Sequence, residues 1–381
     1  LAIVTNKLTG GSGYEARITT GTRAQPAWEN LEIAWENMEL ATGNVETGLR
    51  KVLDRLSRAL LKDNEEAEAA HLNLQAAVDA IQEIRSGLRK AIVEPEQGQI
   101  YWLNSQQNDS VITVNAAPLR VGPILEEDLF ESERSVILTS GTLSTGEGFD
   151  RLRAAVGLNS GGELDLGSPF DYKAAALVAI PQDLPEPNQQ GYPAAVHTAI
   201  RDIALATRDR TLVLFTSNSA LQTAREALKE ELGAQGIRVI GQGPDGTPYR
   251  IMSQLRNEKE VVALGASSLW EGVDLDGTSI KTIIIARLPF PVPSEPVFDA
   301  RSEQYDDSFN EYAVPEAVMR FRQGFGRLIR KTSDRGALVI LDSRVANKRY
   351  GERFIAALPD CRIERGTVAG LGERVKQWLN W

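Results

Sequence analysis

The sequence contains no GxxxxGK[S/T] stretch and no Asp-Glu dipeptide. The first pattern is a P-loop, which cradles nucleotide phosphates with its backbone N–H groups and a lysine. The Asp-Glu dipeptide belongs to a second motif, in which an acidic residue helps to hold magnesium. Neither feature occurs between Leu1 and Trp381. These residues therefore cannot form a complete ATP site of that kind by themselves.

Cysteine is nearly absent, because Cys361 is the single one in 381 residues. This count excludes a disulfide framework, a cysteine-based zinc site and a four-thiolate iron–sulfur cluster within the chain. The formal net charge of −10 gives no general attraction to nucleic acid. A nucleic-acid surface would have to be local, and the segment from Arg320 to Arg353 offers one, with ten Lys or Arg against three acidic residues.

Long apolar runs are also missing from the sequence. No stretch approaches eighteen apolar residues, and the apolar start from Leu1 to Val4 is too short for the hydrophobic region of a signal peptide. We therefore expect a soluble, cytoplasmic protein with no membrane partner. The length of 381 residues predicts two or three domains, each with a real core.

The strongest chemical signal lies between Arg320 and Tyr350. On a helix, Gln323, Arg327 and Arg330 fall at i, i+4 and i+7 and would project from one face. Two arginines so placed suit the oxygens of a transferring phosphoryl group, because guanidinium is planar, permanently charged and a multidentate donor. For an isolated pair of arginines, a solvated basic helix held by surface ion pairs is the simpler interpretation.

Four motifs that follow one another in order favour the phosphoryl-binding role over the solvated basic helix. QGFGRLIR, from Gln323, resembles motif VI of the DinG/XPD-like branch of superfamily 2 DNA helicases. TSGTLS from Thr139 is similar to motif III, LFTSN from Leu214 to motif IV, and WEGVD from Trp270, with RLPFPVPSEP from Arg287, to motif V. The resemblance is specific after the first hundred residues and weak before them. It implies an ATP-dependent DNA helicase that translocates on single-stranded DNA with 5′ to 3′ polarity, in DNA repair or replication.

The resemblance also says where the missing parts would be. In the family, the P-loop, the magnesium-binding DEAH box and the iron–sulfur cluster of many relatives belong to the first motor lobe. The chain begins with Leu1 and not Met, so we expect the C-terminal portion of a larger helicase. ATP and Mg²⁺ would be bound mainly by the missing lobe, with no metal site in this chain. Its partners would be single-stranded DNA and that lobe, and the chain alone would hydrolyse no ATP.

The resemblance assigns roles to particular residues. Arg327 and Arg330 would stabilise charge on the γ-phosphoryl oxygens, and Gln323 would sense that contact. The nucleotide side would be completed by Glu271, Gly272, Asp274 and Gly326. The DNA side would be formed by Thr139, Ser140, Thr216, Ser217, Trp270 and Arg287.

Several of these residues have a simpler structural interpretation. Thr139 and Ser140 could end a strand and cap the next helix, and Thr216 and Ser217 could serve only as a helix N-cap. For Trp270, packing against the lobe is favoured over stacking on a base. Cys361 is expected to be an ordinary core or rim residue.

The first 170 residues are expected to form three regions. Residues 1–25 are predicted to form a connector with a strand over Glu15 to Thr19. Periodic apolar residues predict three amphipathic helices between residues 26 and 98, an all-helical domain that corresponds by position to the family's Arch domain. Residues 99–170 would return to the first motor lobe, with strands over Ile100 to Leu103, Val111 to Val114 and Ser135 to Leu138.

Residues 171–381 alternate apolar runs of strand length with amphipathic helices. The runs are Ala176 to Ile180, Thr211 to Phe215, Arg238 to Gly241, Val261 to Leu264, Thr282 to Ala286 and Ala337 to Leu341. This alternation predicts an α/β fold, with a mainly parallel sheet covered on both faces, similar to a RecA-like helicase lobe. Ligands of such sheets gather at the carboxyl ends of the strands. A basic stretch near Arg344, Lys348 and Arg349 would extend the DNA track there.

Two other classes of function remain open from the sequence. A complete, non-enzymatic protein that binds DNA or a protein partner through a helicase-like lobe would share every motif except the P-loop. An α/β enzyme that uses another nucleotide is disfavoured, because no glycine-rich phosphate-binding turn follows a predicted strand.

Overall fold

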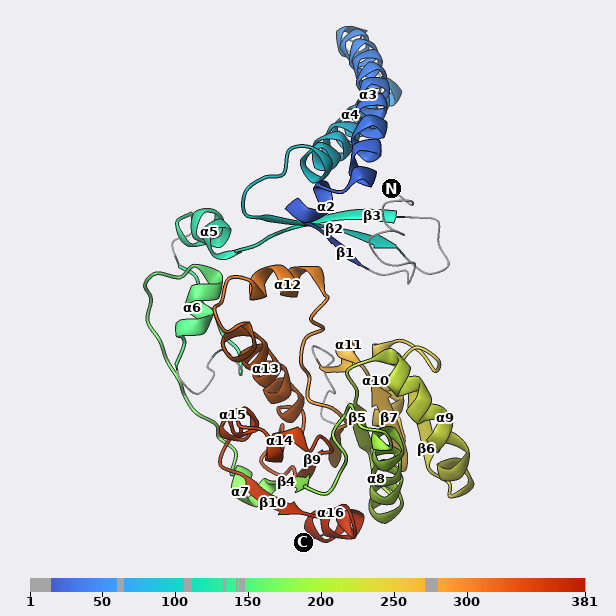
Figure 1. The fold of residues 1–381 in the computed structure, drawn as a ribbon, viewed down its shortest axis with the longest axis vertical. Coiled ribbons are helices and arrows are strands. Elements are labelled where there is room, and N and C mark those ends of the chain that lie inside the picture. Colours follow the sequence, from blue (N-terminus) through green and yellow to red (C-terminus); the bar gives the residue numbers. More distant parts are fainter. Residues whose placement is uncertain are drawn as a thin grey trace. The chain divides into compact units, whose positions relative to one another are not determined.

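The computed structural model describes residues 15–59, 65–105, 112–132, 135–141, 143, 148–270 and 280–380 (Figure 1). The chain divides into two compact units. The first unit comprises residues 1–121 and 292–304, and the second comprises residues 122–291 and 305–381. These boundaries differ from the expected ones at residues 98 and 170, and each unit is described by itself.

The first unit combines a small sheet with a long helical hairpin. Strands β1 (Ala16–Ile18), β2 (Gln99–Ser105) and β3 (Ile112–Pro118) form an antiparallel sheet in the order β1-β2-β3. The short helix α2 (Thr20–Arg23) leads into α3 (Pro26–Ala59), and α4 (Glu65–Ile92) runs back toward the sheet. The buried core lies where the hairpin meets the sheet, around Trp28, Trp35, Ile92 and Leu103.

The prediction of three helices between residues 26 and 98 was wrong, because the first two are one helix, α3, of 34 residues. Gly43 lies in its middle, where glycine costs about 1 kcal/mol relative to alanine. A Cβ at Gly43 would lie 3.2 Å from Nη2 of Arg85 on α4, so the two helices approach closely there. Glu46, one turn later, is buried and accepts hydrogen bonds from Arg85 and from Arg50. The contact of Glu46 with Arg85 joins the two helices, and together with the bond from Arg50 within α3 it offsets the low helix propensity of the glycine.

A distant segment of the chain completes the first unit. Helix α12 (Pro296–Ser302) belongs to residues 292–304, which the sequence placed in the lobe after residue 171. Arg17 donates to both carboxylate oxygens of Glu303, at 2.7 and 2.8 Å, and to Asp299 at 2.9 Å. Arg301 donates to the carbonyl oxygens of residues 118 and 119 at the end of β3. These charged contacts fasten α12 to the sheet.

The strand predicted over Ser135 to Leu138 does not form. Residues 135–140 have no regular secondary structure, and Ile137 is 84% exposed. Apolar, β-prone residues make a strand only where a neighbouring strand pairs with them. The prediction of this strand was therefore wrong, although the strands expected before it, near Ile100 and Val111, correspond to β2 and β3.

The second unit is built on a seven-stranded sheet in which every adjacent pair is parallel. Its order is β10-β4-β9-β8-β5-β7-β6. The strands are β4 (Ala176–Pro181), β5 (Thr211–Leu214), β6 (Arg238–Gly241), β7 (Val261–Gly265), β8 (Thr282–Ile285), β9 (Gly336–Ile340) and β10 (Arg362–Gly366). The predicted α/β class with a parallel sheet is confirmed. Only β10 was not predicted, because this edge strand has three charged residues, a single large apolar one, Ile363, and no apolar run.

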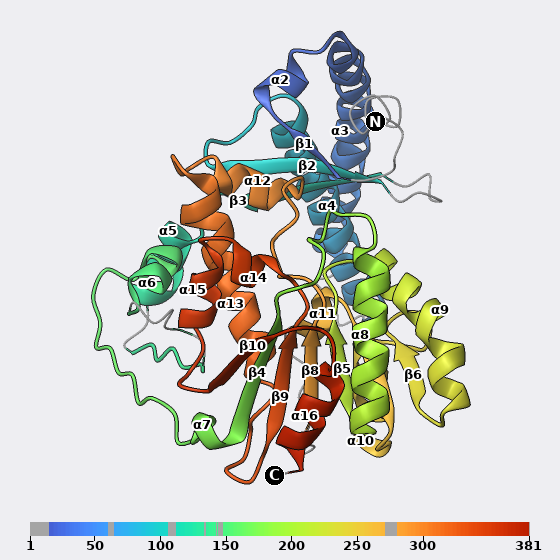
Figure 2. The ribbon, with the colours of Figure 1, turned by 60° about the horizontal axis from the view of Figure 1, so that its bottom comes forward.

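Helices cover both faces of this sheet (Figure 2). One face packs against α8 (Tyr192–Thr207), α9 (Asn218–Ala234) and α16 (Leu371–Leu379). The other packs against α10 (Pro248–Asn257), α11 (Ser267–Trp270), α13 (Val314–Phe325) and α15 (Gly351–Ala356). Burial on both faces explains why the central strands are uniformly apolar.

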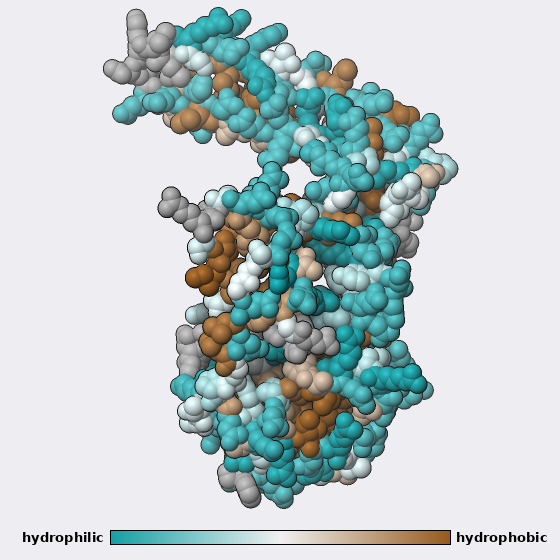
Figure 3. All heavy atoms as spheres, turned by 90° about the vertical axis from the view of Figure 1, so that its left-hand side faces the viewer, coloured by the Kyte–Doolittle hydropathy of each residue, from teal (hydrophilic) through white to brown (hydrophobic). Residues whose placement is uncertain are grey.

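The remaining helices of the second unit are short. They are α5 (Gly122–Leu125), a π-helix over Glu126–Phe130, α6 (Asp150–Val156), α7 (Tyr172–Ala175), a second π-helix over Ser308–Ala313 and α14 (Arg344–Asn347). Between α6 and α7 the chain has no regular structure and exposes Leu164 and Leu166. The face drawn in Figure 3 is mainly hydrophilic, with apolar side chains in separate spots. None of the described helices has the length and apolar character that crossing a membrane requires.

Candidate functional site

Three predicted DNA-contacting residues meet at the carboxyl end of the parallel sheet. Thr216 and Ser217 follow β5, and Arg287 follows the neighbouring strand β8. All three line a pocket of about 260 Å³. The parallel arrangement brings these side chains together because neighbouring strands end at the same side of the sheet.

Ser217 caps helix α9. Its Oγ accepts a hydrogen bond from the backbone N–H of Ala220 at 3.2 Å, so the N-cap interpretation is confirmed. Ser217, Asn218 and Ser219 are all exposed. The N-terminus of a 17-residue helix therefore opens beside the pocket, and its partial positive charge favours an anion there.

Arg287 is an exposed cation on a rigid base. Its Nη2 donates to Oδ1 of Asn188 at 3.3 Å, a long bond between two exposed side chains. The preceding residue, Ala286, is held on both sides: its N–H donates to the carbonyl of Leu214 at 3.0 Å, and its own carbonyl accepts from the Tyr192 hydroxyl. The guanidinium therefore starts from a fixed backbone and keeps a surface on which an anion can bind.

Sequence reasoning missed Asp342, which ties the loops at this end of the sheet together. Asp342 is 0% exposed, and its Oδ2 accepts from the N–H of Leu288 at 2.9 Å. The same carboxylate accepts from Nε of Arg344 at 2.9 Å and from its Nη2 at 2.7 Å. An aspartate directly after the apolar run GALVIL was the available signal, because a charge at that position must find a partner.

The ion pair with Asp342 changes the expected role of the basic stretch. Burial lowers the pKa of Arg344, but hydrogen bonds and charge from Asp342 outweigh that effect and leave the pKa above its ordinary value. Its guanidinium also lies 5.4 Å from the ring centroid of Phe290. Arg344 is thus engaged inside the protein, whereas Lys348 pairs with Glu186 at 2.8 Å and Arg349 is exposed.

The predicted helical face of Gln323, Arg327 and Arg330 is wrong. Helix α13 ends at Phe325, and the chain from Gly326 onward turns out of the helix. Leu328 and Ile329 are buried in the sheet's core, which they reach because the chain leaves the helical path. The helix pattern failed here because core packing overrides the local periodicity of a short segment.

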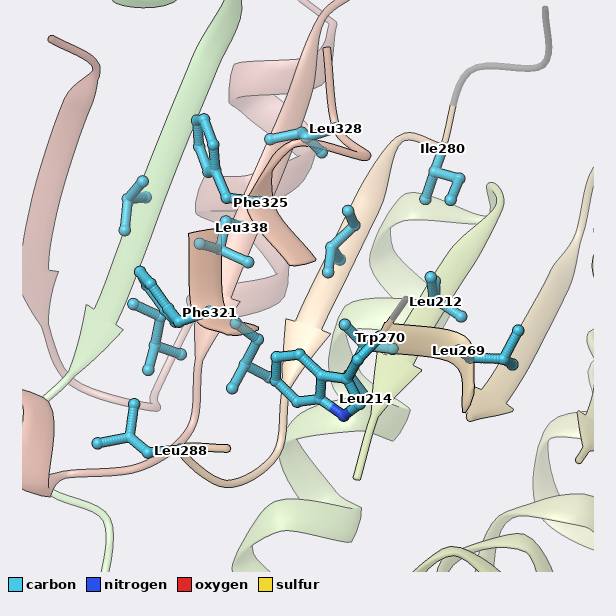
Figure 4. Packing of buried hydrophobic residues seen from close by; sticks show 14 of the residues in the cluster. Leu212, Leu214, Leu269, Trp270, Ile280, Leu288, Phe321, Phe325, Leu328 and Leu338 are labelled. Atoms are coloured by element: carbon cyan, nitrogen blue, oxygen red, sulfur yellow. The ribbon is translucent and has the colours of Figure 1, made fainter. Parts of the chain in front are cut away.

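The structure also separates the arginines from the pocket. Asp334 Oδ2 accepts from the N–H groups of Arg330 and Lys331, each at 2.9 Å, and β9 begins two residues later. Arg330 therefore lies at the amino end of the strands, whereas Thr216 and Arg287 lie at their carboxyl end. Figure 4 shows the same distinction, with Leu328 and Ile280 both toward one end of the strands and Leu288 toward the other.

The two arginines differ in exposure. Arg327 is 6% exposed, and Arg330 is partly exposed. Gln323, in the last turn of α13, has a buried Oε1 that finds no hydrogen-bond partner among the described residues. Gly326 is exposed. Glu271, Gly272 and Asp274 lie outside the residues that the structure describes.

Trp270 is a core residue. It is 3% exposed, and its Nε1 donates to the carbonyl of Phe215 at 2.9 Å. A Cβ at Gly324 would lie 3.2 Å from Cζ3 of the indole, so α13 approaches the ring closely. Packing, the interpretation that the sequence favoured, is confirmed. The buried ring has no face on which a base could stack, so the expected DNA role of Trp270 is withdrawn.

Three further predictions concern residues away from this core. Thr139 and Ser140 are exposed in a segment without regular structure, and they do not cap α6, whose N-cap is Phe149. Cys361 is buried, and desolvation raises the pKa of its thiol to about 11, as suits an unreactive core residue. Within the described ranges, no three His, Cys, Asp or Glu side chains gather as a metal site would require.

Comparisons with known proteins indicate the family to which this chain is related. Residues 200–361 match the family described as Helicase C-terminal domain. The 3'-5' exonuclease DinG of Bacillus subtilis is 31% identical over 78% of this chain and 33% of its own length. The ATP-dependent helicase DinG of Mycobacterium tuberculosis is 34% identical, over 70% of this chain and 41% of its own length. The ATP-dependent DNA helicase YoaA of Escherichia coli is 32% identical, over 75% of this chain and 45% of its own length. The chain thus spans less than half the length of these relatives.

A solved structure shares the fold. It is described as an XPD helicase and is 14% identical, with a TM-score of 0.54, over 95% of this chain and 67% of that chain. The ordered motifs, the parallel sheet and the relatives together identify the chain as a DinG/XPD-like helicase C-terminal region.

Proposed function

We propose that this chain supplies the second motor lobe of an ATP-dependent DNA helicase that translocates on single-stranded DNA in the 5′ to 3′ direction, in repair or replication. One observation carries the proposal: Thr216, Ser217 and Arg287 gather at the carboxyl end of a parallel sheet, beside the open N-terminus of α9. Hydroxyls, free N–H groups and a guanidinium are the donors that hold DNA phosphates.

The DNA contact would be electrostatic and local. The net charge of −10 opposes general binding, so the phosphates must be held by the cluster at the end of β5 and β8. Such contacts position a strand but do not read its sequence. Thr139 and Ser140, exposed in the motif III segment, would add hydroxyls to the track.

The nucleotide contact would come from the other end of the lobe. Arg330 is the more exposed arginine and is the better candidate to reach a γ-phosphoryl group, with buried Arg327 supporting the turn beneath it. Gln323, whose buried Oε1 lacks a partner among the described residues, would sense whether that contact is made. Glu271, Gly272, Asp274 and Gly326 would complete the nucleotide contact.

ATP and Mg²⁺ would be held mainly by a lobe that carries a P-loop, because this chain has none. We therefore propose that the chain alone hydrolyses no ATP. Joined to a P-loop lobe, it would contribute positive charge where the transition state gains negative charge.

The test compares two ends of one lobe in a protein that includes a P-loop lobe. Ser217→Asp keeps an N-cap residue but places a carboxylate where the phosphate would lie, and Ser217→Asn is the matched uncharged cap. Ser217→Asp should lower DNA-stimulated ATPase while basal ATPase remains, and Ser217→Asn should change neither strongly. Arg330→Ala should abolish both rates.

Two results would contradict the assignment. Equal loss of basal and stimulated rates in Ser217→Asp would place Ser217 in folding or nucleotide binding. Full ATPase in Arg330→Ala would remove the proposed role of that arginine. Thr198→Ala, on the exposed side of α8 and outside the pocket, controls for surface substitution in general.

A further inference from the structure

The pocket beside Thr216 has walls and a rim of different chemistry. Its walls, whose accessible surface is mainly apolar, are lined in part by the buried residues Tyr192, Val196 and Phe215. Its rim carries the donors of Thr216 and Arg287. A track that held only phosphates would need the rim alone, so the apolar walls call for a different ligand group.

The aromatic walls are held in place before any ligand arrives. The Tyr192 hydroxyl donates to the carbonyl of Ala286 at the end of β8. Phe215 is fixed through its backbone, since its N–H donates to the carbonyl of Gly265 at 2.8 Å and its carbonyl accepts from Trp270 Nε1. Neighbouring strands and the core thus shape the cavity, and a ligand would enter it at little cost in ordering.

His197 adds a polar group to the pocket lining. Its side chain is half-buried, and burial lowers the pKa of the imidazole, which favours the neutral ring. A neutral imidazole offers one donor and one acceptor. No hydrogen-bond partner of this ring is found in the part of the chain that the structure describes, so both groups can serve a ligand.

The size of the cavity limits the ligand. Pockets for drug-sized molecules measure roughly 300–1,000 Å³. This pocket, at about 260 Å³, suits a single flat ring system rather than a whole nucleotide. Apolar walls, one neutral imidazole and a cationic rim match a base that is still attached to its phosphate.

We propose that this pocket receives one unstacked nucleobase of a bound DNA single strand, while the adjoining phosphate lies against Thr216, Ser217 and Arg287. The inference rests on the proposed function, because it requires a single strand on this end of the sheet. It adds a contact with a base to a track of phosphate contacts. Such a contact would let the lobe grip one nucleotide at a time without reading sequence, since every base has an apolar face.

The experiment fills the pocket and compares strands with and without bases. Thr223 is exposed on α9 and lines the pocket, so the indole of Thr223→Trp would occupy it. Gln222→Trp is the matched control, because residue 222 is the exposed neighbour on the same helix and is not part of the lining. Binding of oligothymidylate and of an abasic sugar–phosphate strand of equal length is measured by fluorescence anisotropy at low salt.

The unaltered chain should bind oligothymidylate about tenfold more tightly than the abasic strand, as expected for one stacked base. Thr223→Trp should lose this preference and keep its affinity for the abasic strand, and Gln222→Trp should keep both. Equal affinity of the unaltered chain for both strands, or equal weakening of both by Thr223→Trp, would overturn the base pocket and leave the phosphate track standing. If neither strand binds, the proposed DNA track fails, and the base pocket that depends on it fails with it.

Discussion

Replacing Asp342 with Asn tests whether the ion pair at the carboxyl end of the sheet holds that end together. The carboxylate is fully buried and takes donors from two directions, the N–H of Leu288 on one side and the Arg344 guanidinium on the other. An asparagine of similar volume has one acceptor oxygen and an NH₂ group. One donor would therefore face another donor, and Arg344 would lose its counter-charge.

The size of the effect follows from that burial. Removing one partner of a buried ion pair costs about 3–5 kcal/mol. The lower end applies here, since the Arg344 side chain is 17% exposed and keeps its contact with Phe290. For a unit of this size, about 3 kcal/mol corresponds to a fall in Tm of roughly 6–12 °C.

Differential scanning calorimetry of the chain measures this shift. The double variant Asp342→Asn with Arg344→Met removes both charges, so its loss of stability should be smaller than the sum of the two single losses by about 1–3 kcal/mol. A Tm for Asp342→Asn within about 1 °C of the unaltered chain, or strict additivity in the double variant, would refute the reasoning. Either result would mean that water or a rearranged loop satisfies Leu288 and Arg344 without the carboxylate.

Three other predictions concern stability and DNA affinity. In urea unfolding, Arg327→Ala should destabilise the chain by about 1–3 kcal/mol and Arg330→Ala by about 0.5 kcal/mol, because Arg327 is 6% exposed and Arg330 is partly exposed. Equal losses of stability in the two variants would contradict this prediction. Cys361 should resist alkylation in the folded chain at pH 8, and its raised pKa makes the folded state retain a proton that the unfolded state loses. Stability should therefore fall as pH rises from about 9 to about 11, and in Cys361→Ala this part of the pH dependence should disappear. Affinity for single-stranded DNA should fall with salt, and a plot of log affinity against log salt concentration should have a slope of about −0.7 for each phosphate held. Arg287→Ala should reduce this slope by about one phosphate contact. An unchanged slope would mean that Arg287 does not contact the DNA.

The sheet of the second unit could be predicted from the sequence because its signal is strong and local. Strands buried on both faces are continuous apolar runs, and six of these runs correspond to β4 through β9. The seventh strand, β10, lies at an edge and needs no such run. The isolated run from Ser135 to Leu138 has the same local signal but finds no strand to pair with, so local sequence alone was insufficient there.

The candidate site was predictable in its residue types but not in its geometry. Motif positions identified Thr216, Ser217 and Arg287, and strand order brings them together at one pocket. Helical periodicity placed Arg327 and Arg330 on one face, but packing of Leu328 into the core ends the helix first. Asp342 and His197 acquire their surroundings from residues far away in the sequence, which no local pattern encodes.

Trp270 contacts both helix α13 and the end of strand β5. The indole donates to the carbonyl of Phe215, the residue directly before Thr216, and its ring packs against Gly324, the residue directly after Gln323. A shift of α13 would therefore press on the ring or leave a gap beside it, and dense cores do not accept either change without a response. The hydrogen bond holds the indole against the backbone at the end of β5. The same tryptophan that is too deeply buried to touch DNA thus joins α13, beside Gln323, to the residue before Thr216 by direct contact.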